Sequence, residues 1–145
     1  MPGILKISEA ASLALHAMIF LMNGQTKNRS TKEIAAALQG SESHLSKVLQ
    51  RLSRAGILDS MRGPRGGFSV SKKGRDATLM EIYEAIEGPF EVGHCVAGSP
   101  ICGKKKCVLL GGLTDSISRQ LRDRLTGTRV RDLGGGDLLD LPSKS

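Results

Sequence analysis

Apolar positions between residues 41 and 56 recur every three or four residues, which is the spacing of one face of an α-helix. This apolar stripe consists of Leu45, Val48, Leu49 and Leu52. Gly56 follows the last apolar position and is expected to end the helix. The pattern predicts a helix that buries one face and leaves the opposite, polar face free to meet a partner.

A short hairpin is predicted directly after this helix. Two strand-like runs, residues 57–62 and 68–70, flank a glycine-rich segment at residues 63–67. The glycines let the backbone of the tip approach another surface closely, and Arg62 and Arg65 stand at that tip. A tip of this kind can enter the minor groove of DNA, whereas the alternative is an ordinary surface hairpin whose arginines are solvated.

A second helix is predicted just before the first. Ser30 and Glu33 form a capping box, in which a hydroxyl and a carboxylate each satisfy the other residue's free backbone amide. A short helix over 32–38 follows, and a turn at Gly40 separates it from the helix that Ser41 can cap. Two helices joined in this way are typical of a helix-turn-helix, and the added hairpin makes the unit a winged helix.

The polar face of the third helix suits the major groove, because its side chains are short, hydrogen-bonding or cationic, and Arg54 shares that face. The residues expected to contact DNA are Ser41, Ser43, His44, Ser46, Lys47, Gln50 and Arg51 from the helix and Arg62, Arg65 and Gly66 from the hairpin. Residues 1–75 hold twelve Lys and Arg against four acidic residues, within a net charge of +7 for the whole chain. This balance favours a polyanionic partner, and a merely basic surface is the alternative.

Helices are also expected on both sides of the winged helix. Residues 8–22 have helical apolar spacing, and Glu9, Ser12 and His16 share one face, which either meets a partner or forms a solvated edge. A second capping box begins at Thr78, and the helix that follows is expected to close the core. The aromatic residues are only three Phe and one Tyr, so the core must be mainly aliphatic.

A long amphipathic helix is predicted near the carboxyl end. Its apolar stripe consists of Leu110, Leu113, Ile117, Leu121 and Leu125. Since no further segment of the chain is left to cover this stripe, we expect it to pack along a second copy, making a homodimer. The predicted class is therefore mainly α, in four regions: a winged helix-turn-helix domain over 1–88, a cysteine loop over 89–108, a dimerisation helix and carboxyl segment over 109–133, and a disordered tail over 134–145.

The three cysteines of the chain, Cys95, Cys102 and Cys107, lie in or just after a segment rich in Gly, Pro and Lys that shows no period. No pair has the spacing of a zinc ribbon. A loop can still bring three thiolates around one metal centre, and the neighbouring lysines favour the thiolate form. An iron-sulfur cluster fits these residues best, and free thiols or a redox disulfide are the alternatives.

Other classes of protein find little support. No apolar run is long enough to span a bilayer, and Glu9 interrupts the start before a signal-peptide pattern can form, so we expect a cytoplasmic protein. We find no paired carboxylates, nucleophile elbow, phosphate-cradling loop or zinc-protease motif, so we expect that the chain is not an enzyme.

Four pieces of sequence carry a family resemblance. They are Arg-Gly-Pro-Arg-Gly-Gly-Phe over 62–68, Ala-Ile-Glu-Gly over 85–88, the three-cysteine loop, and Arg-Leu-Thr-Gly over 124–127 before Asp132 and Leu133. Together they make the chain similar, over residues 7–133, to the winged-helix iron-sulfur regulators of bacteria that include IscR and NsrR. The resemblance implies a homodimeric transcriptional regulator, expected to be a repressor, that reads a palindromic operator on double-stranded DNA.

The same resemblance implies a cluster that sets DNA affinity in response to redox state, nitric oxide or iron-sulfur status. We expect Cys95, Cys102 and Cys107 as ligands and favour a 2Fe-2S over a 4Fe-4S cluster. Leu110 stands where IscR has a histidine, so the fourth ligand is expected to be His16 on the first helix, from which some relatives draw a ligand across the dimer. Glu9, Ser12 or a small thiol are the alternatives. The alternative function is a cluster-free regulator of the same fold that uses thiol oxidation or no cofactor.

Overall fold

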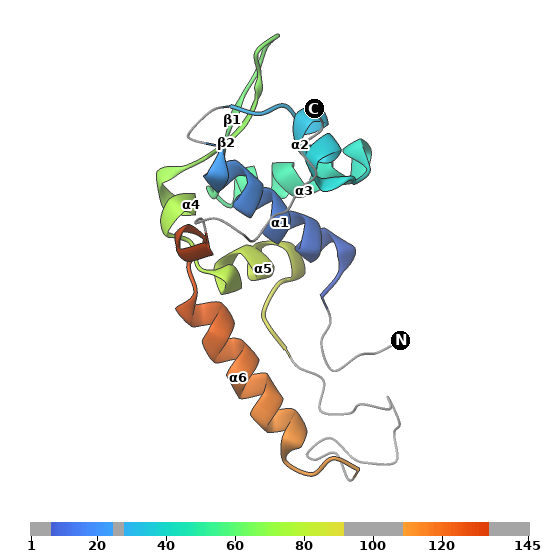
Figure 1. Cartoon of the computed structure of the whole chain (residues 1–145), viewed down its shortest axis with the longest axis vertical. Helices are drawn as coiled ribbons and strands as arrows, with labels where there is room; N and C mark the ends of the chain where they lie inside the picture. The colour runs from blue at the N-terminus through green and yellow to red at the C-terminus, as the bar shows by residue number, and fades with distance from the viewer. Residues whose placement is uncertain (1–6, 25–27, 92–108, 134–145) are drawn as a thin grey trace.

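The computed structural model describes residues 7–24, 28–91 and 109–133. In these ranges the chain forms α1 (Glu9–Asn23), α2 (Thr31–Leu38), α3 (Glu42–Arg54), β1 (Leu58–Met61), β2 (Gly67–Val70), α4 (Lys72–Asp76), α5 (Leu79–Glu87), α6 (Leu113–Gly127) and the 3-10 helix η2 (Val130–Leu133). The predicted mainly helical architecture with one antiparallel hairpin is confirmed. The β1–β2 hairpin projects from one end of the body and α6 from the other (Figure 1). The expected tail over 134–145 lies outside the described residues.

Helices α2 and α5 begin where the sequence predicts, because local side chains satisfy their free amides. The carboxyl-terminal helix begins later than its predicted apolar stripe, since Leu110 lies before α6 and no side chain caps that helix. The hydroxyl of Ser30 accepts from the N–H of Glu33 at 3.1 Å, and the Glu33 carboxylate accepts from the N–H of Ser30 at 2.8 Å. Thr78 and Glu81 make the same reciprocal pair at 3.1 and 2.7 Å. Both predicted capping boxes are confirmed. Gly56, just beyond α3, has a φ of +77°, a conformation that glycine adopts without strain.

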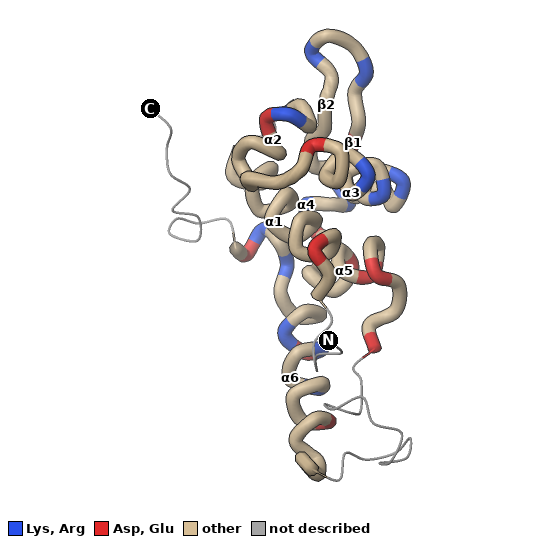
Figure 2. Tube along the Cα trace, turned by 90° about the vertical axis from the view of Figure 1, so that its right-hand side faces the viewer, with Lys and Arg blue, Asp and Glu red and all other residues tan. Residues whose placement is uncertain are grey.

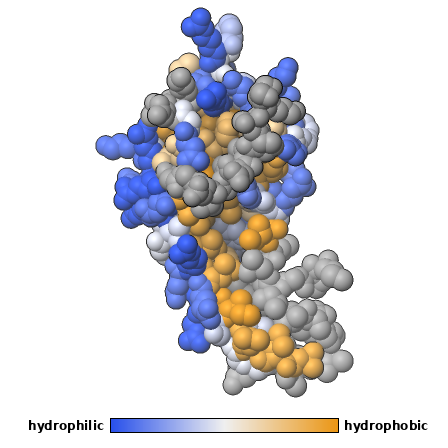
Figure 3. Space-filling model, viewed as in Figure 1, coloured by the Kyte–Doolittle hydropathy of each residue, from blue (hydrophilic) through white to orange (hydrophobic). Residues whose placement is uncertain are grey.

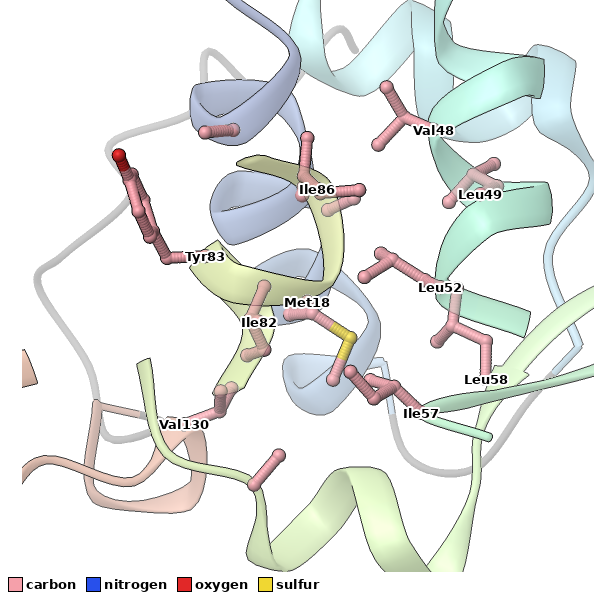
Figure 4. Close-up of a cluster of buried hydrophobic side chains, with 14 of the residues drawn as sticks. Met18, Val48, Leu49, Leu52, Ile57, Leu58, Ile82, Tyr83, Ile86 and Val130 are labelled. Atoms are coloured by element: carbon pink, nitrogen blue, oxygen red, sulfur yellow. The ribbon is translucent and has the colours of Figure 1, made fainter. Parts of the chain in front are cut away.

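The core lies where α1, α3 and α5 meet. Figure 4 shows Val48, Leu49 and Leu52 of α3 facing the side of the core that holds Ile82 and Ile86 of α5. The largest fully buried side chains are Met18, Ile34, Leu45, Val48, Leu49, Leu52, Leu58, Ile82 and Val130. Since this packing buries the whole apolar stripe of α3, the opposite face of the helix must point outward.

The hairpin is fixed to the connection between α1 and α2. Arg29 and Phe68 exchange both backbone hydrogen bonds, at 2.9 and 2.8 Å, so the chain before α2 pairs with β2. The side-chain amide of Asn28 donates to the carbonyl of Arg65 at 3.0 Å. A Cβ on Gly67 would lie only 2.2 Å from the Arg29 carbonyl oxygen, so this position accepts no side chain. The surface that this glycine approaches is the protein's own backbone.

The chain returns to the body after α6. Val130 in η2 is 1% exposed, and its N–H donates to the carbonyl of Ala77 at 3.2 Å. The N–H of Leu79 donates to the carbonyl of Thr128 at 2.9 Å. The short elements α4 and η2 were not anticipated from the sequence, because four or five residues carry no detectable period. Among the described ranges, no helix is long and apolar enough to cross a membrane.

Candidate nucleic-acid interface

The outward face of α3 presents hydrogen-bonding and cationic groups. Its exposed residues are Ser43, Lys47, Gln50, Arg51 and Arg54, and Glu42 is exposed at the start of the helix. Spacings of three and four residues keep these side chains on one face of the helix. At the start of the helix the hydroxyls of Ser41 and Ser43 are 3.0 Å apart, and one turn further on the Gln50 amide donates to the hydroxyl of Ser46 at 3.4 Å. The face therefore offers donors and acceptors that a base edge or a phosphate can meet.

The hairpin carries two arginines beyond the body. Arg62 and Arg65 are both exposed, and Figure 2 shows a basic position on each side of the hairpin tip. The N–H of Gly66 donates to the carbonyl of Gly63 at 2.8 Å, which closes the tip turn. A Cβ on Gly66 would lie 2.4 Å from the carbonyl oxygen of Met61. The tip is thus slim, and it carries two exposed arginines.

An open groove of about 760 Å³ separates the hairpin from α2 and α3. Lys32 lines it from the start of α2, Gln50 and Arg54 line it from α3, and Arg62 lines it from the hairpin. Glu42 lines it as well, so three cations stand against one carboxylate, and this positive balance suits a phosphate backbone. The sequence alone did not predict Lys32 at this groove. The backbone pairing that brings the start of α2 close to the hairpin joins Arg29 and Phe68, which are distant in the sequence.

Two residues of the predicted DNA-contact set make contacts with other helices of the body. Nδ1 of His44 lies 3.7 Å from a carboxylate oxygen of Glu9 on α1, which is an ion pair when the imidazole is protonated. Nη2 of Arg51 donates to the backbone carbonyl of Ile86 on α5 at 2.6 Å. These contacts could not be read from the sequence, because they join residues that are 35 positions apart in each case.

Of the four expected cluster ligands, the structure describes His16. Cys95, Cys102 and Cys107 lie outside the described residues. His16 is exposed on α1, and its Nδ1 lies 2.7 Å from the carbonyl oxygen of Ser12. Among the described residues, no three His, Cys, Asp or Glu side chains are grouped to hold a metal ion.

A helix-turn-helix, an arginine-bearing hairpin and a cationic groove between them define a winged-helix DNA-binding protein. The chain belongs to the Rrf2 family, whose model, described as an iron-dependent transcriptional regulator, matches residues 7–135. It is therefore a helix-turn-helix transcriptional regulator and not an enzyme. The predicted resemblance to the IscR-type regulators is confirmed.

Two curated relatives are both HTH-type transcriptional regulators named IscR. The IscR of Cereibacter sphaeroides is 25% identical over 144 residues, which cover 96% of this chain and 93% of the relative. The IscR of Enterobacter sp. strain 638 is 27% identical over 124 residues, covering 85% of this chain and 73% of the relative.

Solved structures show the same fold. CymR of B. subtilis, described as its global cysteine regulator, is 27% identical with a TM-score of 0.69, covering 90% of this chain and 96% of CymR. IscR of T. potens is 21% identical with a TM-score of 0.65, covering 89% of this chain and 85% of that one, which is a likeness of fold.

Arg65→Ala should weaken binding to a duplex that the parent protein selects from a random-sequence library. The expected loss is about 1–3 kcal/mol, because one arginine contact to a groove is removed. Titration at matched salt measures it. Arg119→Ala is the control, since Arg119 is exposed on α6 at the far end of the molecule from the hairpin (Figure 1). If Arg65→Ala binds as tightly as the parent, the hairpin does not contact DNA as proposed.

Proposed function

We propose that this regulator binds a palindromic operator as a homodimer, acts as a repressor, and carries an iron-sulfur cluster that sets its DNA affinity. The observation that carries the cluster proposal is the geometry of His16. Its Nδ1 is held by the backbone carbonyl of Ser12, which is the arrangement that fixes a histidine tautomer with Nε2 free to bind metal. His16 is also exposed, so that nitrogen is accessible from outside the helix.

The donor set fits an iron-sulfur cluster. Cys95, Cys102 and Cys107 supply three thiols within thirteen residues, and the lysines at 104–106 favour their ionised form. With His16 they make three soft ligands and one imidazole, a combination suited to iron. When bound, the cluster supplies a group that changes charge on oxidation or reduction and is open to attack by nitric oxide. The iron–imidazole bond is weaker than the iron–thiolate bonds, because the imidazole can be lost by protonation.

On the DNA side, the proposal assigns the two grooves to different elements. Ser41, Ser43, Ser46, Lys47 and Gln50 face the major groove from α3. The hairpin enters the adjacent minor groove through Arg62, Arg65 and the slim turn at Gly66. The phosphate strand between the two grooves then lies along the cationic groove that Lys32 and Arg54 line.

The dimer proposal rests on α6. Leu121 and Leu125 pack against the core, but Leu113 is 51% exposed and Ile117 is only partly buried. Figure 3 shows an apolar strip running along α6 beyond the body. A strip of this kind is costly to leave in water, and the same helix of a second copy covers it with matching spacing.

A cluster-free regulator is the second candidate. The likeness in fold and sequence to CymR, described as a global cysteine regulator, favours it. In that case the cysteines act through thiol oxidation, or the protein uses no cofactor.

The visible absorption spectrum of anaerobically purified protein distinguishes the two candidates. We expect a cluster spectrum in the parent, its loss in Cys102→Ala, and a shifted spectrum in His16→Ala, because the fourth iron bond changes its donor atom. His44→Ala is the matched control, since His44 lies on α3 with its Nδ1 3.7 Å from a carboxylate oxygen of Glu9. A colourless parent would favour the cluster-free regulator, and a spectrum unchanged in His16→Ala would exclude that histidine as a ligand.

Ile117→Lys should convert the dimer to monomers, because it places two like charges in the proposed seam. Sedimentation equilibrium measures the mass. Thr126→Lys is the control, since it adds the same charge to an exposed position about two and a half turns along the same helix, on its opposite face. A monomeric parent, or a dimeric Ile117→Lys variant, would show that α6 does not form the interface.

A further inference from the structure

One flank of α3 borders the body of the protein, beside the proposed DNA surface; His44 is partly buried there and Arg51 is exposed. His44 and Arg51 are seven residues apart, which is two helical turns, so they share this flank. Both make polar contacts with other helices, His44 with Glu9 of α1 and Arg51 with Ile86 of α5. Lys47 is turned about the helix axis by roughly a sixth of a turn or less from His44 and Arg51, so the proposed DNA contacts and the contacts with the body lie next to each other on α3.

The Arg51 contact is made at the carboxyl end of α5. The last carbonyls of a helix have no partner within it and carry the negative end of the helix dipole. Nη2 of Arg51 donates to the Ile86 carbonyl at 2.6 Å, one residue before the helix ends at Glu87. A guanidinium here is therefore held by a charge-assisted hydrogen bond, in an orientation set by α5.

The same end of α5 is tied to two further helices. We call residues 84–90 the α5 junction. The hydroxyl of Ser8, which caps α1, donates to the carboxylate of Glu87. Arg122 of α6 donates to the carbonyl of Phe90 at 3.3 Å and lies over its ring, 5.2 Å from the centroid. The α5 junction thus connects α1, α3 and α6.

The α5 junction is also fixed internally. The N–H of Phe90 donates to the carboxylate of Glu84 at 3.0 Å, and its ring, in a residue only 7% exposed, meets the ring of Tyr83 edge-on at 5.5 Å between centroids. Burial, followed by the charges of Glu87 and Glu84, raises the pKa of Tyr83 above its usual 10.0, so the phenol keeps its proton at neutral pH. Figure 2 shows the acidic positions along α5.

The α5 junction precedes the cysteine segment directly in the sequence, since Cys95 follows Phe90 by five residues. A change in how that segment is held is therefore transmitted to residues 84–90 through the continuous chain. From there Arg51 reaches the helix that carries the DNA face. The geometry points to Arg51 as a positioning residue: through the Ile86 carbonyl it sets the orientation of α3, and it makes that orientation depend on the state of the cysteine segment. The second half of this inference rests on the proposed function.

The test compares Arg51→Ala with Arg54→Ala. Both variants remove one cation from the last turn of α3, but Arg54 lines the groove proposed for the phosphate strand. Operator and random-sequence duplexes are titrated over a range of salt concentrations with full-length protein, in its anaerobic cluster-loaded form and in its cluster-free form. Salt dependence reports the number of phosphate contacts, a quantity that a positioning residue does not change.

We expect Arg54→Ala to lower the salt slope by about one, the value for one lost phosphate contact, and to keep the affinity difference between the two forms. Arg51→Ala should keep the parent's salt slope, lose discrimination between operator and random duplex by at least about tenfold, and bind operator with nearly equal affinity in its two forms. Arg51→Lys keeps a donor for the Ile86 carbonyl and should restore part of both properties, which separates positioning from a failure to fold.

Two results would overturn the inference. A salt slope lowered by about one in Arg51→Ala would make Arg51 a phosphate contact. The contact with α5 does not position α3 if Arg51→Ala discriminates operator from random duplex as well as the parent does. The same conclusion follows if the cluster-loaded and cluster-free forms of Arg51→Ala differ in operator affinity as much as those of the parent. A parent whose two forms bind equally would instead count against the proposed function and the coupling drawn from it, while the slope and discrimination still decide the positioning role.

Discussion

Burial of one face of α3 is the interaction on which the rest of the structure depends. Leu45, Val48, Leu49 and Leu52 are at most 2% exposed. Each such side chain contributes about 1.5–3 kcal/mol relative to leaving it in water, so a rotation of the helix large enough to expose them is strongly opposed, and only small adjustments of its orientation are left to contacts such as that of Arg51. The polar face has no freedom to turn inward. The proposed DNA-reading surface therefore follows directly from a hydrophobic requirement.

The hairpin needs a second constraint, because a two-stranded hairpin alone is only marginally stable. Backbone pairing between Arg29 and Phe68 supplies it, and Gly67 permits the close approach. The chain before α2, the hairpin and α3 thereby become one unit. Phosphate, major-groove and minor-groove contacts can then be made together, without ordering a loop at the moment of binding.

Local features were predictable from the sequence, and contacts between distant residues were not. The helices could be predicted because each signal involves residues close in the sequence: the capping boxes at Ser30 and Thr78, and the apolar stripe of α3. The hairpin could be predicted from its own glycine-rich segment. The burial of Val130 and the inward hydrogen bond of Arg51 depend on how α5 lies against its neighbours. Periodicity places Arg51 on a polar flank of its helix, but it carries no information about whether that flank meets DNA or the body.

Chemical footprinting on the selected duplex tests the central claim that α3 and the hairpin of two copies bind DNA as one unit. Dimethyl sulfate reports contacts to guanine in the major groove, and hydroxyl radicals report sugars along the minor groove. The account predicts two symmetric half-sites, each with major-groove protection beside minor-groove protection, separated by about one helical turn or a multiple of it. Protection confined to one groove, or a single half-site with no symmetric mate, would contradict it.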